Sequence, residues 1–430
     1  MFNFLFRDGS IFFIMRILVI RNLNPFYESS ASANRWRTLL QGLADNGANI
    51  TIIAIGGYNS WLEIKKTFTA DWNSSVKVHH TFLSLADSLF FRRVNRYVLS
   101  PLFRYYNLLY IKIFIKLFKP DIIWTNASNP EETFLLKRLL QSRKYKTMLE
   151  LSEFDDLQPI VKNHFLKRYL NGRFNDMRNF ILPHVDIFNI MTLRLLEHYK
   201  ELSGGNKFYI HTPMTVDLSR FDLSQKQVHM NNNTLHKPYI MFCGAISNQK
   251  DGVDILIQAF AVITRKYPQY FLYIVGPRTH DSAFLDQLVE KLGLASKVIF
   301  TGAVDRDRIP GMLFSADILA LARPLSHQAD GGFPTKLGEY LATGNPVCVT
   351  TTGEIAEYLT DGESAFLAEP GNPESFAEAL ERVLADYDYA RKIGQNGRLV
   401  AEKSFNMNLQ AKKLYNALEH YLVQPYEILH

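Results

Sequence analysis

Short apolar runs alternate with amphipathic stretches along most of the chain, and this alternation restricts the possible folds more than any other feature. In the first half, apolar runs at 17–20, 49–55 and 120–125 are separated by stretches with helical spacing, such as 32–46. This pattern predicts parallel sheets with crossover helices. Because 430 residues exceed one ordinary hydrophobic core, we expect two domains of the α/β class.

The second half repeats the pattern, with apolar runs at 239–243, 271–275, 298–301, 318–322 and 347–350. We therefore expect two Rossmann-like domains that face each other across a cleft, where ligands of such folds commonly bind. The expected divisions are a disordered N-terminal extension (1–14), a first domain (15–213), a polar linker (214–238), a second domain (239–403) and a C-terminal helix that crosses back to the first domain (404–430).

The composition is that of a globular protein, with 47% hydrophobic and 21% charged residues. The net charge of +6 fits anionic substrates or an anionic membrane surface. The two cysteines, Cys243 and Cys348, lie in apolar runs, so we expect buried thiols, neither a disulfide framework nor a metal site, and a cytoplasmic location. No apolar run is long enough to predict a transmembrane helix.

The segment 330–350 has the pattern of a Gly-rich loop, a helix, a stop at Gly344 and a buried strand. A helix that opens from such a loop presents unpaired N–H groups and a positive dipole end to an anion. Lys336 adds a cation in the first turn, and Glu339 follows as an acceptor for a diol. A diphosphate beside a diol is what a nucleotide sugar offers, although an ordinary strand–helix turn explains the segment alone equally well.

Several segments follow one another in the order found in the family 4 glycosyltransferases. Because of this order, the stretch 238–422 resembles that family. In the first half of the chain, the matches are limited to 119–123 and 214–221. The segments in the second half are 239–244, 250–260, 268–276, 298–302, 309–318, 331–346, 357–362 and 366–370.

The resemblance implies the GT-B fold and a retaining transfer of a sugar from a UDP- or GDP-sugar to a glycan or lipid-linked acceptor, in cell-surface polysaccharide biosynthesis. It implies no metal and no cofactor besides the donor. By position, Lys250 would contact the diphosphate and Glu339 the ribose. The expected catalytic residues are Lys250, Lys336, Glu339 and Asp330. The expected substrate-binding residues are Gly244, Gly331, Gly332, Phe333, Pro334, Thr335, Asn126 and Glu354.

Three positions depart from the family pattern: Ala245 replaces an Arg, Gly331 replaces the first of two Glu residues, and Asn126 replaces a His. Asp330 is one place from the missing Glu, and we take Lys336 as the replacement for the missing Arg. A non-catalytic nucleotide-sugar-binding or scaffold protein and a sugar-nucleotide epimerase of the same fold remain as alternatives. A dinucleotide oxidoreductase is disfavoured, because no Gly-x-Gly-x-x-Gly follows a first strand.

Two other groups of residues have open interpretations. Glu354 either supports donor binding by its loop or is an acidic residue that favours a helix start. The acids Glu150, Glu153, Asp155 and Asp156 are expected to be solvated or to contact an acceptor hydroxyl, and not to bind a metal.

Residues 88–120 contain seven Lys or Arg residues, many aromatic residues and no Asp or Glu. Such a segment suits peripheral contact with an anionic membrane, here the inner face of the plasma membrane. The alternative is a crossover helix with one apolar side on the sheet. Nucleic acid is not an expected partner, because neither half contains a recognised nucleic-acid-binding module.

Overall fold

The computed structural model describes residues 4–7, 10–27, 30–56, 76–81, 100–142, 144–154, 171–204, 206–231, 235–279 and 281–423. Residues 88–99 of the basic aromatic segment, together with Asp155 and Asp156, lie outside these ranges. The chain divides into two compact units. Unit 1 comprises Met1–Thr212 and Asn408–His430, and unit 2 comprises Pro213–Met407.

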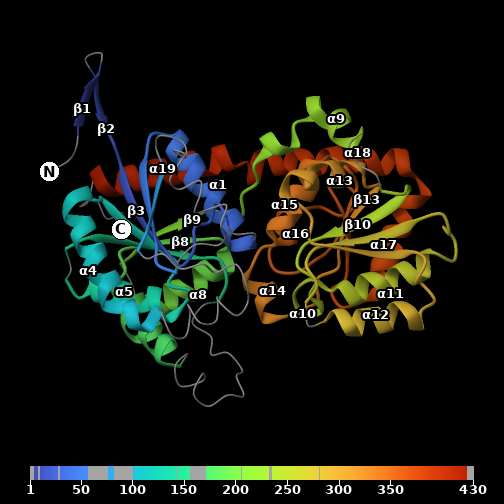
Figure 1. Ribbon diagram of the computed structural model, residues 1–430. Coiled ribbons are helices and arrows are strands. Elements are labelled where there is room, and N and C mark those ends of the chain that lie inside the picture. Colours follow the sequence, from blue (N-terminus) through green and yellow to red (C-terminus); the bar gives the residue numbers. More distant parts are fainter. Residues whose placement is uncertain are drawn as a thin grey trace. The chain divides into compact units, whose positions relative to one another are not determined.

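Unit 1 contains a seven-stranded parallel sheet in the order β5-β4-β3-β6-β7-β8-β9 (Figure 1). Successive side chains of a strand point to opposite faces, so Ile17 and Val19 pack on one face and Leu18 and Ile20 on the other. The strands are β3 (Arg16–Arg21), β4 (Asn49–Ala54), β5 (Val76–His80), β6 (Ile122–Thr125), β7 (Lys146–Leu151), β8 (Ile187–Ile190) and β9 (Phe208–His211).

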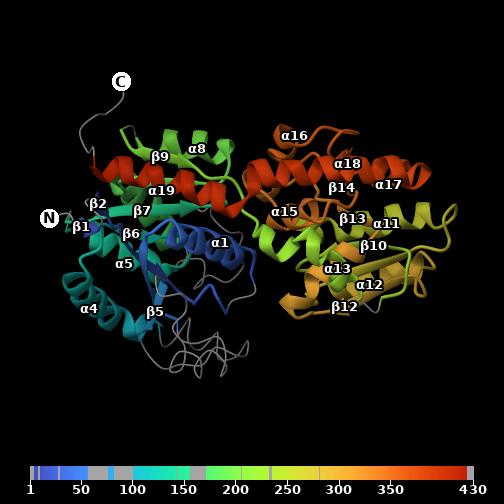
Figure 2. The ribbon, with the colours of Figure 1, turned by 90° about the horizontal axis from the view of Figure 1, so that it is seen from above.

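Helices cover both faces of this sheet. α1 (Ala31–Asp45) and α19 (Met407–Val423) contribute to the core on one face, and Figure 2 shows them on the same side of the sheet. On the other face lie α4 (Ser100–Phe118), α5 (Pro130–Leu140) and α8 (Leu193–Ser203). The sequence sets these helix starts: the side chains of Ser30, Asn129 and Thr192 cap α1, α5 and α8.

Unit 2 contains a six-stranded parallel sheet in the order β12-β11-β10-β13-β14-β15. The strands are β10 (Tyr239–Cys243), β11 (Phe271–Val275), β12 (Val298–Gly302), β13 (Ile318–Leu321), β14 (Val347–Thr350) and β15 (Phe366–Ala368). The α-helices are α9 (Lys226–Asn231), α10 (Asn248–Asp251), α11 (Val253–Ile263), α12 (Ser282–Lys291), α13 (Ile309–Ser315), α14 (His327–Gly331), α15 (Thr335–Ala342), α16 (Ile355–Tyr358), α17 (Pro373–Ala385) and α18 (Tyr387–Val400). The expected α/β class with two Rossmann-like domains is confirmed.

Each sheet reverses its strand order at one place, between β3 and β6 in unit 1 and between β10 and β13 in unit 2. Ligands of open α/β sheets bind beyond the carboxyl ends of the strands at such switch points. Asn126 follows β6, Gly244 follows β10, and Arg323 lies two residues after β13. The topology therefore directs attention to these positions.

Two expectations about the chain outside the sheets differ from the structure. Instead of a disordered extension, β1 (Phe4–Arg7) and β2 (Ser10–Phe13) pair in antiparallel fashion. In the sequence, apolar residues flank Asp8-Gly9, a dipeptide typical of hairpins, and this pattern favours the pairing. The expected linker 214–238 belongs to unit 2 and contains η3 (Leu218–Phe221), η4 (Leu223–Gln225) and α9, because Phe221 is buried against Phe314.

A buried ionic network joins three elements of unit 1. Arg35 of α1 donates from Nε to Glu150 Oε1 of β7 at 2.6 Å and from Nη2 to the carbonyl of Thr212 at 2.9 Å. Glu150 also accepts from Asn189 of β8 at 2.7 Å, and all four residues are buried. The expectation that Glu150 is solvated or contacts an acceptor is therefore wrong, since its strand position points it into the unit.

We predict that Arg35→Ala destabilises the protein by about 3–5 kcal/mol, because it leaves the Glu150 carboxylate buried without its cation. Chemical unfolding followed by circular dichroism would measure the loss. Arg382→Ala is a suitable control, because Arg382 pairs with Asp361 on the surface and such pairs contribute at most about 1 kcal/mol. Equal losses for the two variants would contradict a structural role for the network.

Candidate functional site

Lys336 is the central side chain at the switch point of unit 2. It lies in the first turn of α15, and its Nζ is 2.6 Å from Asp251 Oδ1 at the end of α10. The ammonium also lies 4.7 Å from the ring centroid of Phe242 on β10. Burial lowers the pKa of Lys336, and the ion pair with Asp251 opposes this effect. Arg323 and Lys250 lower it further, so several cations gather at this place.

Gly244 provides the space that Lys336 occupies. A Cβ atom at position 244 would lie 2.6 Å from Lys336 Nζ and 2.7 Å from its Cε, so a larger residue would displace the ammonium. Gly252, which follows α10, has φ of +65°, and a Cβ there would lie 1.8 Å from the carbonyl oxygen of Ala322. Gly244 thus allows Lys336 of α15 to lie close to the end of β10, and Gly252 allows α10 to lie close to the end of β13.

Arg323 holds the surrounding loops together, and the sequence reasoning missed it. Its buried guanidinium donates to the carbonyls of Lys250 and Gly332, each at 3.3 Å. Its own carbonyl accepts from Thr350 Oγ1 at 2.7 Å. A guanidinium can serve several acceptors in fixed geometry, so Arg323 ties α10 to the loop before α15. An Arg placed directly after a buried apolar strand was the available signal.

Glu339 lies one turn after Lys336 on the same face of α15. Its Oε1 accepts from Arg220 Nη1 at 2.8 Å, and Arg220 Nη2 donates to the carbonyl of Arg306 at 2.9 Å. Burial lowers the pKa of Arg306, and the positive charge of Arg220 lowers it further. Arg220 lies in the stretch that the sequence suggested as a linker, so its partnership with Glu339 was not foreseen.

The loop that precedes α15 differs from the Gly-rich loop expected from residue 330. Asp330 and Gly331 are the last residues of the short helix α14, whose start is capped by Ser326, which accepts from the N–H of Ala329 at 3.0 Å. Gly332 and Pro334 then lead to α15, which begins at Thr335. The ring of Phe333 is buried against Tyr358 and Phe405, with ring centroids 5.4 and 5.3 Å away. The Phe333 side chain therefore anchors this loop.

The two remaining expected residues occupy different places. Glu354 is buried at the start of α16, beside Gly353, whose backbone at φ of +56° packs on the carbonyls of Ala329 and Asp330. Burial raises the pKa of Tyr358 to about 12, and the negative charge of Glu354 adds to this rise. Asn126 lies in unit 1, and its buried Oδ1 accepts no hydrogen bond from any residue that the structure describes.

Tyr340 fixes α15 to the end of β10. Its hydroxyl accepts from the N–H of Cys243 at 2.6 Å and lies 3.3 Å from the carbonyl of the same residue. Burial raises the pKa of the Cys243 thiol to about 12, so this thiol stays protonated at neutral pH. Cys243 and Cys348 are both free; Cys348 is buried as expected, whereas Cys243 is only partly buried.

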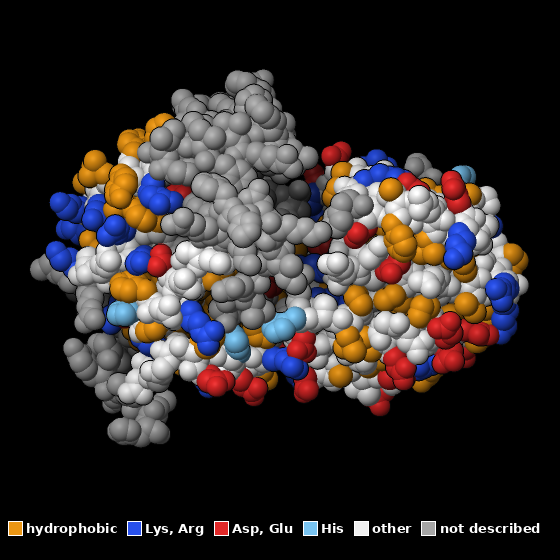
Figure 3. All heavy atoms as spheres, turned by 90° about the horizontal axis from the view of Figure 1, so that it is seen from below, with side chains coloured by type: hydrophobic (Ala, Val, Ile, Leu, Met, Phe, Trp, Pro, Cys, Tyr) orange, Lys and Arg blue, Asp and Glu red, His pale blue; other side chains and the backbone are white. Residues whose placement is uncertain are grey.

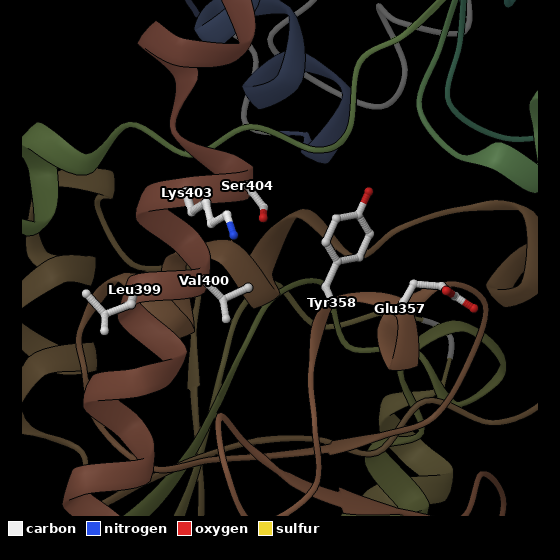
Figure 4. A pocket seen from close by; sticks show the side chains of 6 residues that line it. All are labelled: Glu357, Tyr358, Leu399, Val400, Lys403 and Ser404. Atoms are coloured by element: carbon white, nitrogen blue, oxygen red, sulfur yellow. The ribbon is translucent and has the colours of Figure 1, made fainter.

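A separate hollow lies between α16 and α18 (Figure 4). Figure 4 shows Lys403 and Ser404 across from Tyr358. None of its lining residues belongs to the expected site. The lining residues are Glu357, Tyr358, Leu399, Val400, Lys403 and Ser404.

Two features are absent from the described part of the chain. It contains no group of three or more His, Cys, Asp or Glu residues that could hold a metal ion. Among its helices, none is long and apolar enough to span a membrane.

Unit 2 is similar to known proteins of one family. Residues 225–400 match the family described as glycosyl transferases group 1, in agreement with the resemblance seen in the sequence. A GDP-mannose-dependent alpha-(1-6)-phosphatidylinositol monomannoside mannosyltransferase of Mycolicibacterium smegmatis is 26% identical over 54% of this chain and 62% of its own. The chain spans less than half of the length of the first curated relatives it matches.

Solved structures match the fold over nearly the whole chain. Sucrose-phosphate synthase from Thermosynechococcus elongatus is 18% identical, with a TM-score of 0.73, and the match covers 94% of this chain and 99% of that one. HepE of Anabaena in complex with UDP is 16% identical, with a TM-score of 0.63, over 94% and 100% of the two chains. The GT-B fold expected from the sequence is thereby confirmed.

We predict that Lys336→Ala weakens binding of a nucleoside diphosphate by roughly ten- to a hundredfold, since a charged hydrogen bond is lost. Isothermal titration calorimetry with UDP and GDP would measure the change. Lys392→Ala, which alters an exposed lysine of α18, is the control and should bind as the wild type does. Unchanged affinity in Lys336→Ala would exclude Lys336 as a phosphate ligand.

The lowered pKa of Lys336 also predicts a dependence on pH. The lysine is cationic below its pKa, so nucleotide binding should be strongest there and should weaken as the pH rises through that value. Calorimetry over a pH series would show this loss in the wild type. A variant Lys336→Arg that still binds should show no such loss, because arginine keeps its charge; an identical decline in both proteins would assign the titration elsewhere.

Proposed function

We propose that this protein transfers a sugar from a UDP- or GDP-sugar to a hydroxyl group of a glycan or lipid-linked acceptor, with retention of anomeric configuration, in the assembly of a cell-surface polysaccharide. The group 1 family of unit 2 supports the class of reaction. The mycobacterial relative is named for GDP-mannose, and HepE is a neighbour solved with UDP, so both nucleotides are candidates.

The observation that carries the proposal is the position of the Lys336 ammonium against Gly244, at the start of α15. A helix start offers N–H groups to an anion, and the neighbouring lysine adds a full charge. Glu339, on the same face of the helix, accepts hydrogen bonds and suits a ribose diol. A diphosphate at Lys336 and a ribose at Glu339 therefore follow the order of groups in a nucleotide sugar.

In the proposed reaction, the bond between the anomeric carbon and the diphosphate oxygen breaks, and its electron pair leaves with the nucleoside diphosphate. The acceptor oxygen forms a bond to the same face of the anomeric carbon, and its proton passes to the departing phosphate oxygen. Lys336, Lys250 and the N–H groups around Thr335 stabilise the charge on the leaving group. These groups need no metal ion for that task in our proposal.

Asp251 has a defined part in this scheme. In the nucleotide-free protein the Asp251 carboxylate pairs with Lys336, and this pairing favours the charged form of the partly buried lysine. Arg323 holds Lys250 and Gly332 by their carbonyls, so it positions the backbone on both sides of the proposed diphosphate site. Asn126, with its unsatisfied oxygen beyond β6, is the proposed acceptor-side contact in unit 1.

We predict that one of UDP and GDP binds to the wild type and that Glu339→Ala weakens this binding by roughly ten- to a hundredfold, because the ribose loses a charged acceptor. Calorimetry on both nucleotides would measure it and would name the base. The control is Glu363→Ala, which changes an exposed carboxylate of unit 2. Failure of a folded wild type to bind either nucleotide would overturn the proposed donor site.

Turnover separates the enzyme from its alternatives. A glycosyltransferase releases the nucleoside diphosphate at a rate that rises when the acceptor is added. An epimerase converts the donor without any acceptor, and a binding or scaffold protein leaves the donor unchanged. Chromatography of the donor and its products distinguishes the three outcomes, and either of the last two would contradict the proposed reaction.

A further inference from the structure

Helix α4 is apolar on both sides, which is unusual for a helix at a protein surface. Its inner side packs Leu108, Ile111 and Ile115 into the core below the sheet. Its outer side carries a second apolar row that no described residue of unit 1 covers. We call this row the α4 stripe, which consists of Tyr105 (66% exposed), Leu109 (58%), Ile113 (51%) and Leu117 (78%).

The α4 stripe is a continuous line. Its members are four residues apart, so they lie on one face of the helix and extend over about 18 Å. Tyr106 is also half-exposed beside the stripe. Figure 3 shows hydrophobic and basic side chains gathered at the upper left, over α4.

Lysines follow one edge of the stripe. Lys112 and Lys116 are exposed, each three residues after a stripe residue, and neither forms an ion pair with any residue that the structure describes. Arg104 differs from them, because Glu131 of α5 holds it by two hydrogen bonds of 2.9 and 2.6 Å. The cations that remain available are therefore those beside the exposed apolar row.

We infer that the α4 stripe docks on the surface of an anionic phospholipid bilayer. The stripe would enter the boundary between headgroups and acyl chains, and Lys112 and Lys116 would contact lipid phosphates. A tyrosine at the end of the stripe suits the same boundary, because its ring is apolar and its hydroxyl can hydrogen-bond to water. The helix lies flat on the sheet of unit 1 through its inner side, which suits an interfacial helix rather than a spanning one.

Charge favours lipid over a second copy of the chain as the partner. Residues 88–120 contain no Asp or Glu, so two copies meeting through α4 would bring lysines together without a counter-charge in this segment. An anionic bilayer supplies that counter-charge. This inference does not depend on the donor site, so membrane docking and nucleotide binding can fail separately.

The test is flotation of the full chain with vesicles of phosphatidylcholine mixed with phosphatidylglycerol, and with vesicles of phosphatidylcholine alone. We expect binding to the anionic vesicles that weakens with added salt. The triple variant Leu109→Gln, Ile113→Gln, Leu117→Gln should lower the partition coefficient by at least about tenfold. The double variant Lys112→Gln, Lys116→Gln should lower it by roughly fivefold for each lysine.

Matched controls change similar residues elsewhere. Leu193→Gln with Leu223→Gln and Leu409→Gln removes three exposed leucines outside α4, and Lys392→Gln with Lys412→Gln removes two exposed lysines. Both controls should bind vesicles as the wild type does, and thermal unfolding should confirm that all variants fold.

Three results would overturn the inference. The first is absence of wild-type binding to anionic vesicles, and the second is equal loss in the test and control variants. The third is a wild-type dimer, detected by sedimentation, that the triple variant dissociates while vesicle binding is absent. That last result would assign the stripe to a second copy of the chain.

Discussion

Parallel pairing of the strands is the constraint on which the rest of this structure depends. A parallel sheet brings the carboxyl ends of its strands to one edge, and a reversal of strand order separates two neighbouring loops there. In unit 2 this geometry brings Gly244, after β10, and Arg323, after β13, to the same switch point. Residues far apart in the sequence thereby become one candidate site, because the strand order brings them together.

Electrostatics then determine what that site can hold. Lys336 is buried enough for its pKa to fall, and Arg323 and Lys250 add positive charge, while Asp251 provides the nearby carboxylate. Such an arrangement is costly without an anion, because buried charges need partners. A diphosphate would supply negative charge to these cations and to the N–H groups at the start of α15.

Much of this could be predicted from the sequence, since periodicity and composition are local properties. The parallel sheets, the helix that carries Lys336 and Glu339, and the burial of Cys348 all follow from local patterns. Partnerships could not be predicted in the same way. Arg220 reaches Glu339 across 119 positions and Arg323 reaches Lys250 across 73, so their roles exist only in the folded chain.

The errors have equally specific causes. A serine cap at Ser326 lets the first part of the expected Gly-rich loop form α14, and the Asp8-Gly9 dipeptide favours a hairpin over a disordered extension. Local sequence groups Glu150 with loop acids, because its partner, Arg35, lies 115 positions away. The ring of Phe333, a residue expected to bind substrate, packs between Tyr358 and Phe405.

The most direct test of the central claim is a crystal structure of the protein with UDP or GDP, whichever binds. The account predicts the diphosphate within hydrogen-bonding distance of Lys336 Nζ and of the N–H groups at the start of α15, with a ribose hydroxyl on Glu339. A nucleotide bound elsewhere, for example in the hollow beside Tyr358 and Lys403, with Lys336 still paired to Asp251 and remote from phosphate, would contradict it.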